Sequence, residues 1–412
     1  MQRIVVTGLG AVTPIGNDVP TFWKNLIAGQ SGADTIRAFD PTDFPVKIGC
    51  EVKDFKATDW MERKLVKRTA QMTQFALAAA RQALADANFE ITEENRDEVG
   101  VIVNTGGGGI PFVENATYTL LDKGPRAVGP FVVPSIMPNA VSCLISIETG
   151  ATGPILTSTL ACASGNYAMV EGLHMLQRGE AKVIIAGGSE RSATRVTFAA
   201  FDRMGALSRR NHDPQKASRP FDADRDGFVY GEGAGVFILE TEEHAQARGA
   251  KIYAEVAGGS LTGDAYHVTA PEPTGRGAIR AIKLALKESG LKAEDVSVIY
   301  AHGTSTPLND ATETKAIKAA LGEHAYQVPI TATKSMVGHG MGAAGAIAAV
   351  GAVMTIREGI VPPTINYETP DPDCDLDYVP NEARKHRADV VLINAFGFGG
   401  QNVVLVLKRY EG

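Results

Sequence analysis

The sequence predicts an α/β protein built from two similar halves that pack together. Buried strands ending in glycine- or alanine-rich turns alternate with helical segments along the whole chain. The pattern begins again after about residue 250, which divides the chain into an N-terminal half, 1–250, and a C-terminal half, 251–412. The clearest repeat is a strand, a small-residue turn and a helix, written PILTSTLACASGNYAMVEGLHMLQRGE and then PITATKSMVGHGMGAAGAIAAVGAVMTIREG. Each half is therefore expected to offer one helix N-terminus to a shared centre.

The composition is that of an ordinary globular protein. The chain has 412 residues, of which 44% are hydrophobic and 21% charged, which is enough for two domains or one large fused one. Its net charge of −7 argues against general nucleic-acid binding. The first residues, MQRIVVTGLG, enter a strand at once and leave no room for a signal peptide, and no apolar run is expected to cross a bilayer. We therefore expect a cytoplasmic protein without membrane attachment.

Two glycine-rich turns follow early strands. A strand is expected over 3–8, and the Gly8-Leu9-Gly10 after it resembles a dinucleotide fingerprint, but Pro14 interrupts the following helix and no third glycine follows in register. A second strand, 99–104, runs into the glycines at 106–109, which lack the GK[ST] of a phosphate loop. Glycine-rich backbone beside a pocket is the better interpretation.

A long amphipathic helix is predicted over 61–87, and its start is basic. The basic side chains either form a solvated face or dock an acidic partner, and both interpretations stay open; they are Arg63, Lys64, Lys67 and Arg68. Residues 130–138 are predicted to form an irregular loop, and residues 154–160 a strand.

Cys162 lies where that strand turns into a helix. The helix N-terminus offers unpaired N–H groups and a positive dipole end, both of which favour a thiolate nucleophile. A buried structural cysteine is the alternative. The other cysteines, Cys50, Cys143 and Cys374, are widely spaced with no CxxC, which suggests neither a disulfide framework nor a metal site.

Two other motifs imitate known sites. Asp222 to Gly227 has the start of a calcium loop, but Gly233 stands where the pattern needs glutamate, and a strand follows where a helix should. Gly340 to Gly345 spells GxGxxG after a strand, without the acidic residue expected on a second strand.

Three further groups can join Cys162. His302 follows a strand predicted over 296–301, Lys334 follows one over 330–333, and His339 lies in the turn that matches the cysteine turn. Either histidine alone is more often a satisfied loop residue. Here both histidines follow strand ends, and the other half has a cysteine at the matching place. This combination favours a shared catalytic centre.

Several long motifs in series resemble the elongating β-ketoacyl-[acyl-carrier-protein] synthases, from VTGLGAVTPIG to the last strand: TLACASGNYA, SRPFDADRDGFVYGEGAG, AHGTSTPLND, TKSMVGHGMGAAGA and NAFGFGGQN. The resemblance implies a thiolase-like fold, in which two related halves form a five-layered αβαβα core, and a homodimer. It implies decarboxylative condensation of an acyl group with malonyl-acyl carrier protein. No metal or other cofactor is implied, because the substrates ride on the phosphopantetheine of the carrier.

The resemblance also assigns roles to residues. Cys162 matches the acyl-accepting nucleophile, His302 and His339 the two histidines that assist decarboxylation, and Lys334 the family lysine. The remaining matches are the gate and oxyanion-hole residue Phe398, the pantetheine-binding Thr304 and Thr306, the acyl-pocket residues Gly107, Val132 and Phe201, and the carrier-docking Arg63, Lys64, Lys67 and Arg68.

Some positions depart from the family pattern. Ala348 stands where the family usually has a glutamate near the lysine, so the orientation of Lys334 is an open question. Gly107 and Val132 are small where the family has larger apolar groups, which predicts a roomier pocket for long or branched chains. Gln401 replaces the usual threonine.

Three functional interpretations follow from these residues. The first is an elongating synthase of fatty acid biosynthesis, and the second is the same chemistry in a specialised lipid or polyketide pathway. The third, a silent partner subunit of the chain-length-factor kind, is disfavoured because Cys162, both histidines and Lys334 are all present. A nucleotide-dependent oxidoreductase is less favoured still.

Overall fold

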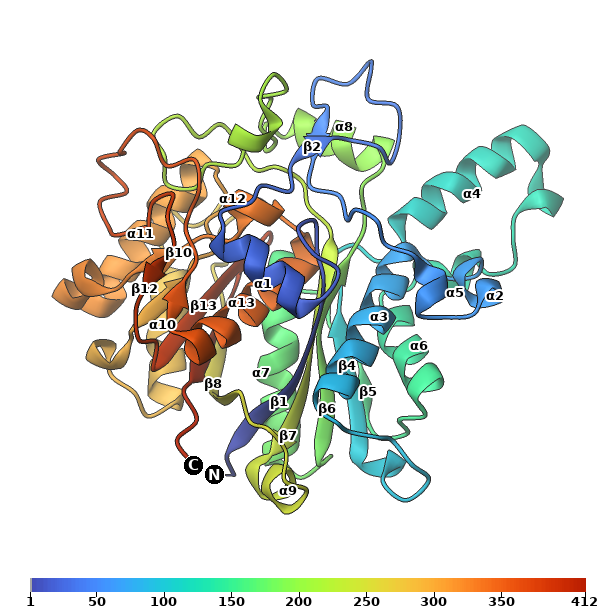
Figure 1. Ribbon diagram of the computed structural model, residues 1–412. Coiled ribbons are helices and arrows are strands. Elements are labelled where there is room, and N and C mark those ends of the chain that lie inside the picture. Colours follow the sequence, from blue (N-terminus) through green and yellow to red (C-terminus); the bar gives the residue numbers. More distant parts are fainter. Residues whose placement is uncertain (1) are drawn as a thin grey trace.

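Ten strands form one continuous sheet that divides into two equal units (Figure 1). The computed structural model describes residues 2–412. The sheet order is β10-β9-β13-β14-β8-β1-β7-β6-β4-β5. The first unit holds β1 (Ile4–Val12), β7 (Gly233–Thr241), β6 (Val183–Glu190), β4 (Val99–Asn104) and β5 (Ile155–Leu156). The second holds β8 (Ala254–Gly263), β14 (Gln401–Lys408), β13 (Val390–Gly397), β9 (Val298–Tyr300) and β10 (Ile330–Thr331).

The two units repeat the same strand directions. In the first, β1, β7 and β6 pair antiparallel, and β6, β4 and β5 pair parallel. In the second, β8, β14 and β13 pair antiparallel, and β13, β9 and β10 pair parallel. The units meet where β1 pairs with β8, with Ile4 opposite Val256. The predicted boundary at residue 250 lies between α9, which ends at Ala247, and β8.

Helices cover both units and fill the space between them, which gives five layers. Helices α3 (Gln71–Asp86) and α6 (Ala140–Thr149) pack on the outer face of the first unit, and α10 (Arg276–Glu288) and α11 (Pro307–Leu321) cover the second. Between them, α7 (Ser164–Gln177) and α13 (Ala344–Glu358) contact strands of both units (Figure 1). The predicted αβαβα arrangement of two similar halves is confirmed.

Helices α7 and α13 begin in the same way and cross at glycines. Each follows a one-turn 3₁₀ helix whose first residue has a positive φ, +47° at Ala161 and +42° at Met341. A Cβ on Gly165 would lie 2.7 Å from the backbone nitrogen of Ala346, and one on Gly345 would lie 2.3 Å from Asn166 Oδ1. The small residues of the repeated motif thus bring both helix N-termini together at the centre of the molecule.

The helix predicted over 61–87 is wrong as a single element. It is two helices, α2 (Arg63–Val66) and α3, separated by residues 67–70. The Gln74 side-chain amide donates to the carbonyls of Val66 and Thr69, at 2.9 and 3.0 Å, and so satisfies acceptors that the break leaves free. A tertiary contact made from the next helix therefore stabilises the break.

Two other expectations also need correction. Residues 130–138 are not irregular, because Val132–Ile136 forms the short helix α5. Pro134 is tolerated there because it lies in the first turn, where no intrahelical donor is required. The strand expected over 154–160 is limited to β5, because Ser158 donates its N–H to Asn104 Oδ1 instead of to a neighbouring strand.

One helical stretch, Met341–Glu358, is long and apolar enough to cross a membrane, contrary to the expectation from sequence. It is 89% buried inside the fold, where it forms the central helix α13 and the turn before it. The remaining elements lie around the core: α1 (Val19–Ile27), α4 (Ile110–Lys123), α8 (Arg195–Arg203), α9 (Glu242–Ala247), α12 (Lys334–Val337), and the small sheets β2 (Asp34–Thr35) with β3 (Ile48–Gly49) and β11 (Ile360–Val361) with β12 (Arg384–Lys385).

Candidate active site

Cys162 lies in the 3₁₀ turn Ala161–Ala163, directly before α7, and only 5% of it is exposed. The Ser164 hydroxyl accepts the N–H of Leu160 at 2.9 Å and donates to the carbonyl of Ala161 at 2.8 Å, which fixes the turn. This is the strand-to-helix position that the sequence predicts.

Both histidines lie beside the cysteine. His339 Nε2 is 3.1 Å from Cys162 Sγ, and His339 Nδ1 accepts the N–H of Met341 at 3.3 Å. An acceptor at Nδ1 places the ring proton on Nε2, which faces the sulfur. The ring of His302 is nearly perpendicular to that of His339, with 5.5 Å between centroids. The thiol and two imidazoles thus converge on one point from both halves of the chain.

Lys334 is oriented without the family glutamate. Its Nζ donates to the carbonyl of His302 at 2.6 Å, while Ala348 is buried in the apolar core. The carboxylate of Glu313 on α11 accepts the N–H groups of His302 and Gly303, both at 2.8 Å. A lysine and a glutamate therefore hold the backbone of His302 from its two sides.

Burial dominates the protonation state of the thiol. It raises the pKa of Cys162 to about 11, although Lys334 and the N–H groups of Phe398 and Cys162 itself lower that pKa. Burial therefore opposes the thiolate that the position at a helix N-terminus favours.

The histidines and the lysine are also shifted toward their neutral forms. Burial and the charge of Lys334 lower the pKa of both His302 and His339 well below the usual range. Burial lowers the pKa of Lys334 to about 8, against the opposing effect of Glu313. Two neutral imidazoles can each donate one N–H to a developing negative charge.

A cavity of about 350 Å³ connects the three groups to solvent. Cys162, His302 and His339 all line it, and each is at most 5% exposed. Thr304 and Thr306 line its course with their hydroxyls 2.9 Å apart, and Phe398 lines it as well. The cavity thus combines polar hydroxyls and apolar rings with access to the sulfur.

The predicted pocket residues Gly107, Val132 and Phe201 do not line this cavity. The ring of Phe201 packs 5.5 Å from that of Phe228, which does line it. A Cβ on Gly107 would lie 3.0 Å from Ile110 Cδ1, so Ile110 occupies space that a side chain at 107 would take. Their role in holding an acyl chain stays a prediction.

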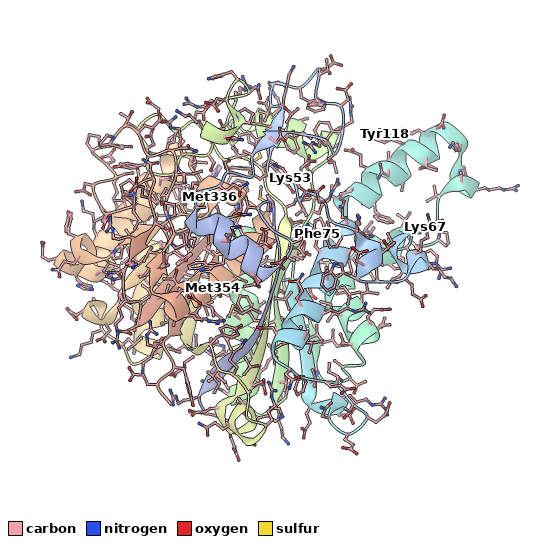
Figure 2. All side chains as sticks on the ribbon, in the orientation of Figure 1. Lys53, Lys67, Phe75, Tyr118, Met336 and Met354 are labelled. Atoms are coloured by element: carbon pink, nitrogen blue, oxygen red, sulfur yellow. The ribbon has the colours of Figure 1, made fainter. Side chains whose placement is uncertain are left out.

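The basic residues in α2 and directly after it are available to a partner. Arg63, Lys64 and Lys67 are exposed, and within residues 2–412 none of them forms an ion pair. Lys67 lies on the side of the molecule that carries α2 and α5 (Figure 2). Arg68 is half-buried, with its guanidinium 4.5 Å from the centre of the Phe131 ring.

Sequence reasoning missed Glu313 and Phe228. Phe228 packs edge-on against His339, with 5.3 Å between ring centroids. Both lie in motifs quoted above or directly after them, and Glu313 stands eleven residues after His302. No residue pattern marks them, because the partners of Glu313 are two backbone N–H groups and the side-chain amide of Asn394, which is distant in sequence, and the ring of Phe228 only packs.

Comparison with known proteins agrees with this geometry. The "Beta-ketoacyl synthase, N-terminal domain" family matches residues 1–245, and the "Beta-ketoacyl synthase, C-terminal domain" family matches residues 253–368. A 3-oxoacyl-[acyl-carrier-protein] synthase 2 of Synechocystis sp. is 53% identical over 410 residues, covering 100% of this chain and 99% of that protein. One of Staphylococcus aureus is 45% identical with the same coverage.

Solved structures show the same fold. The ishigamide ketosynthase/chain length factor superposes with a TM-score of 0.93 at 39% identity, and a β-ketoacyl synthase from Burkholderia phymatum with 0.92 at 34%. A type II polyketide ketosynthase in complex with its acyl-carrier protein gives 0.91 at 36%. Each covers 100% of both chains. With both domain families matched in order across the two halves that build the site, the chain belongs to the β-ketoacyl synthases.

Proposed function

We propose that the protein elongates an acyl chain by decarboxylative condensation with malonyl-acyl carrier protein, as in fatty acid biosynthesis. The observation that carries the proposal is the convergence of the Cys162 thiol with His339, at 3.1 Å, and with His302 in the lining of one cavity. A nucleophile beside two neutral hydrogen-bond donors suits acyl transfer followed by enolate formation.

In the first step, Cys162 Sγ attacks the thioester of an acyl carrier. The tetrahedral oxyanion is stabilised by the N–H groups of Cys162 and Phe398, the groups that also lower the pKa of the thiol. The carbon–sulfur bond to pantetheine breaks, the proton of the thiol ends on the pantetheine sulfur, and the acyl group remains on Cys162.

In the second step, malonyl carrier replaces the free carrier and loses CO2. The electron pair of the broken carbon–carbon bond becomes an enolate on the thioester. His339, whose Nε2 carries the proton, and His302, which is neutral and lines the cavity, donate to the enolate oxygen. Neutral donors suit this role because they stabilise the charge without transferring a proton completely.

In the third step, the enolate carbon attacks the acyl group on Cys162. A carbon–carbon bond forms, the bond to Sγ breaks, and 3-oxoacyl carrier leaves. The sulfur regains a proton from solvent through the cavity. Lys334 stays outside these bond changes and holds the carbonyl of His302, which keeps that ring in place between turnovers.

The proposal is tested by intact-protein mass spectrometry with acyl carriers of increasing chain length, followed by malonyl carrier. The wild type should gain one acyl mass and lose it on addition of malonyl carrier, with a product two carbons longer. C162A should gain no mass, whereas H302A and H339A should be acylated but retain the acyl group. Failure of every acyl carrier to load the wild type would overturn the proposal.

We propose that the carrier docks on α2 and that the reaction needs no metal or other cofactor. Arg63, Lys64 and Lys67 give this face positive charge within a chain of net charge −7. An acidic carrier would be attracted to this patch, and its attraction would fall as salt rises. We also propose a cytoplasmic location, and its support is the sequence.

We also propose a homodimer formed through the first half. Strand β5 is the edge of the ten-stranded sheet, and its Ile155 and Leu156 are exposed. Neighbouring helices add further exposed apolar side chains on α4, α5 and α6, namely Val113, Tyr118, Leu120, Leu121, Val133 and Ile147. An edge strand surrounded by exposed apolar groups is a surface suited to a second copy.

A specialised pathway is the second candidate. It rests on position 107, where the resemblance implies a larger side chain and where Ile110 instead fills the space beside Gly107. The chain-length panel described above decides between the two, because a primary synthase should load ordinary straight chains best.

A further inference from the structure

Glu190 is a buried carboxylate that the proposed reaction does not use. It is the last residue of β6 and is 0% exposed. Its Oε2 accepts the N–H groups of Gly106 at 2.7 Å, Gly107 at 3.2 Å and Gly342 at 3.2 Å, and the hydroxyl of Thr105 at 3.3 Å. These donors come from both halves of the chain, so one oxygen atom joins the two halves.

The contact that Glu190 bridges is tight. A Cβ on Gly342 would lie 2.2 Å from the nitrogen of Gly106, so the two loops touch backbone to backbone. Their N–H groups point at the same place and need a common acceptor. Without one, the buried donors would be left unsatisfied, which costs about 1–3 kcal/mol for each group.

Both loops lead directly to the reacting groups. Gly342 lies in the 3₁₀ turn Met341–Ala343, three residues after His339, and the N–H of Met341 binds His339 Nδ1. On the other side, a Cβ on Gly106 would lie 3.2 Å from the carbonyl oxygen of Ala161, the residue before Cys162. Glu190 therefore binds the backbone next to the place where the turn after His339 meets the turn that carries Cys162.

The two halves use their equivalent strand ends differently. Glu190 ends the eight-residue β6, and Gly397 ends the eight-residue β13. A Cβ on Gly397 would lie 3.3 Å from the nitrogen of Cys162. Each strand end thus meets the turn of the opposite half, but only β6 ends in a side chain that can bind it.

We infer that Glu190 is a positioning residue: its carboxylate holds the turn after His339 so that Nε2 of that ring stays within reach of Cys162 Sγ. The consequence for catalysis rests on the proposed function. The geometry itself predicts a property of the thiol that can be measured without any carrier protein.

Two effects of Glu190 on the thiol must be separated. Its charge raises the pKa of Cys162, whereas its hold on His339 favours the thiolate through the Nε2 proton. Comparing variants of equal charge removes the first effect. E190Q and E190A are both neutral, but only the amide oxygen of glutamine can accept from the three N–H groups. The wild type and E190D both have a carboxylic acid at this position, but the aspartate side chain is one methylene too short to reach the three N–H groups.

The experiment measures the rate of Cys162 alkylation by iodoacetamide at pH 8 in all four proteins. We expect E190A to react about tenfold more slowly than E190Q, because alanine leaves the three buried N–H groups without the acceptor that the glutamine amide oxygen still provides. E190D should be slower than the wild type in the same way, and this pair decides the matter if E190A does not fold. Equal rates within each pair would overturn the inference.

The same comparison in the H339A background separates positioning from general stability. With the imidazole absent, the E190Q and E190A versions should differ less than twofold, because Glu190 acts through that ring. An undiminished difference would also overturn the inference. Glu240 gives a matched control, since it is a buried glutamate bound to Arg248 and His244 away from the site. E240Q should lower the Tm without changing alkylation.

The two proposals fail in distinguishable ways. If the proposed function is wrong, the wild type will not condense acyl groups, but the alkylation comparison remains valid. If the role of Glu190 is wrong, the wild type will condense acyl groups while the charge-matched variants are alkylated alike.

Discussion

The Cys162 thiol experiences opposing effects, and burial is the larger. Its pKa is about 11. At any pH below that value, the thiolate fraction should therefore increase about tenfold for each unit by which the pH is raised. We therefore predict that the iodoacetamide rate climbs about tenfold per pH unit from pH 7 to pH 9. Mass spectrometry of the alkylated Cys162 peptide measures it. A plateau at or below pH 8 would mean that the helix N-terminus prevails over burial.

Lys334 imposes a stability cost on the fold. Its pKa falls from 10.5 to about 8, so the unfolded chain binds more protons between those values and stability rises with pH across that window. Below pH 8 the full cost remains, about 3 kcal/mol from the shift alone. The hydrogen bond to the His302 carbonyl offsets about 1 kcal/mol of it.

K334M should therefore raise the free energy of unfolding at pH 7 by about 2 kcal/mol while lowering condensation. Urea unfolding at pH 7 and at pH 10.5 measures the effect, and the gain should shrink at the higher pH. K318M is the control, because Lys318 forms an exposed pair with Asp375. A destabilised K334M at pH 7 would contradict the argument.

At the scale of elements, the break between α2 and α3 decides how the basic side chains are presented. Q74L removes the amide that binds the carbonyls of Val66 and Thr69 and should loosen α2. We predict that the Kd for acyl carrier protein, measured by fluorescence anisotropy at low salt, becomes several-fold larger. Q71A changes the exposed first residue of α3 and should bind normally. Unchanged binding by Q74L would show that docking does not depend on α2.

Some elements could be predicted from the sequence pattern, whereas others could not. VGVIVN at 99–104 forms a strand with those bounds because every residue in it is buried. The 61–87 prediction failed because Gln74 reaches back across the break, a contact with no local signature. Glu190 and Glu313 were missed for the same reason, since most of their partners are backbone N–H groups and the others, Thr105 and Asn394, lie far away in the sequence. Cys162, His302 and His339 could be predicted to lie together because each follows a strand within a long motif, and the structure does bring them together.

For the whole molecule, the edge of the sheet predicts assembly. We expect a dimer by light scattering coupled to size exclusion, and we expect the double variant I147E/I155E to be a monomer. Both side chains are exposed on the first half, 73% and 45% respectively. Introducing two carboxylates there should oppose an apolar interface. L284E, on α10 of the second half, is the matched control. A monomeric wild type would refute the proposed dimer.

The repeated halves also set the stoichiometry of acyl loading. Gly342 stands in the turn that matches the one carrying Cys162, but the nitrogen of Gly106 lies 2.2 Å from where its Cβ would be. No side chain, and hence no second sulfur, can be placed there. The two nearly equivalent turns therefore offer one sulfur per chain, and under the proposed function saturating the proposed dimer should attach two acyl groups.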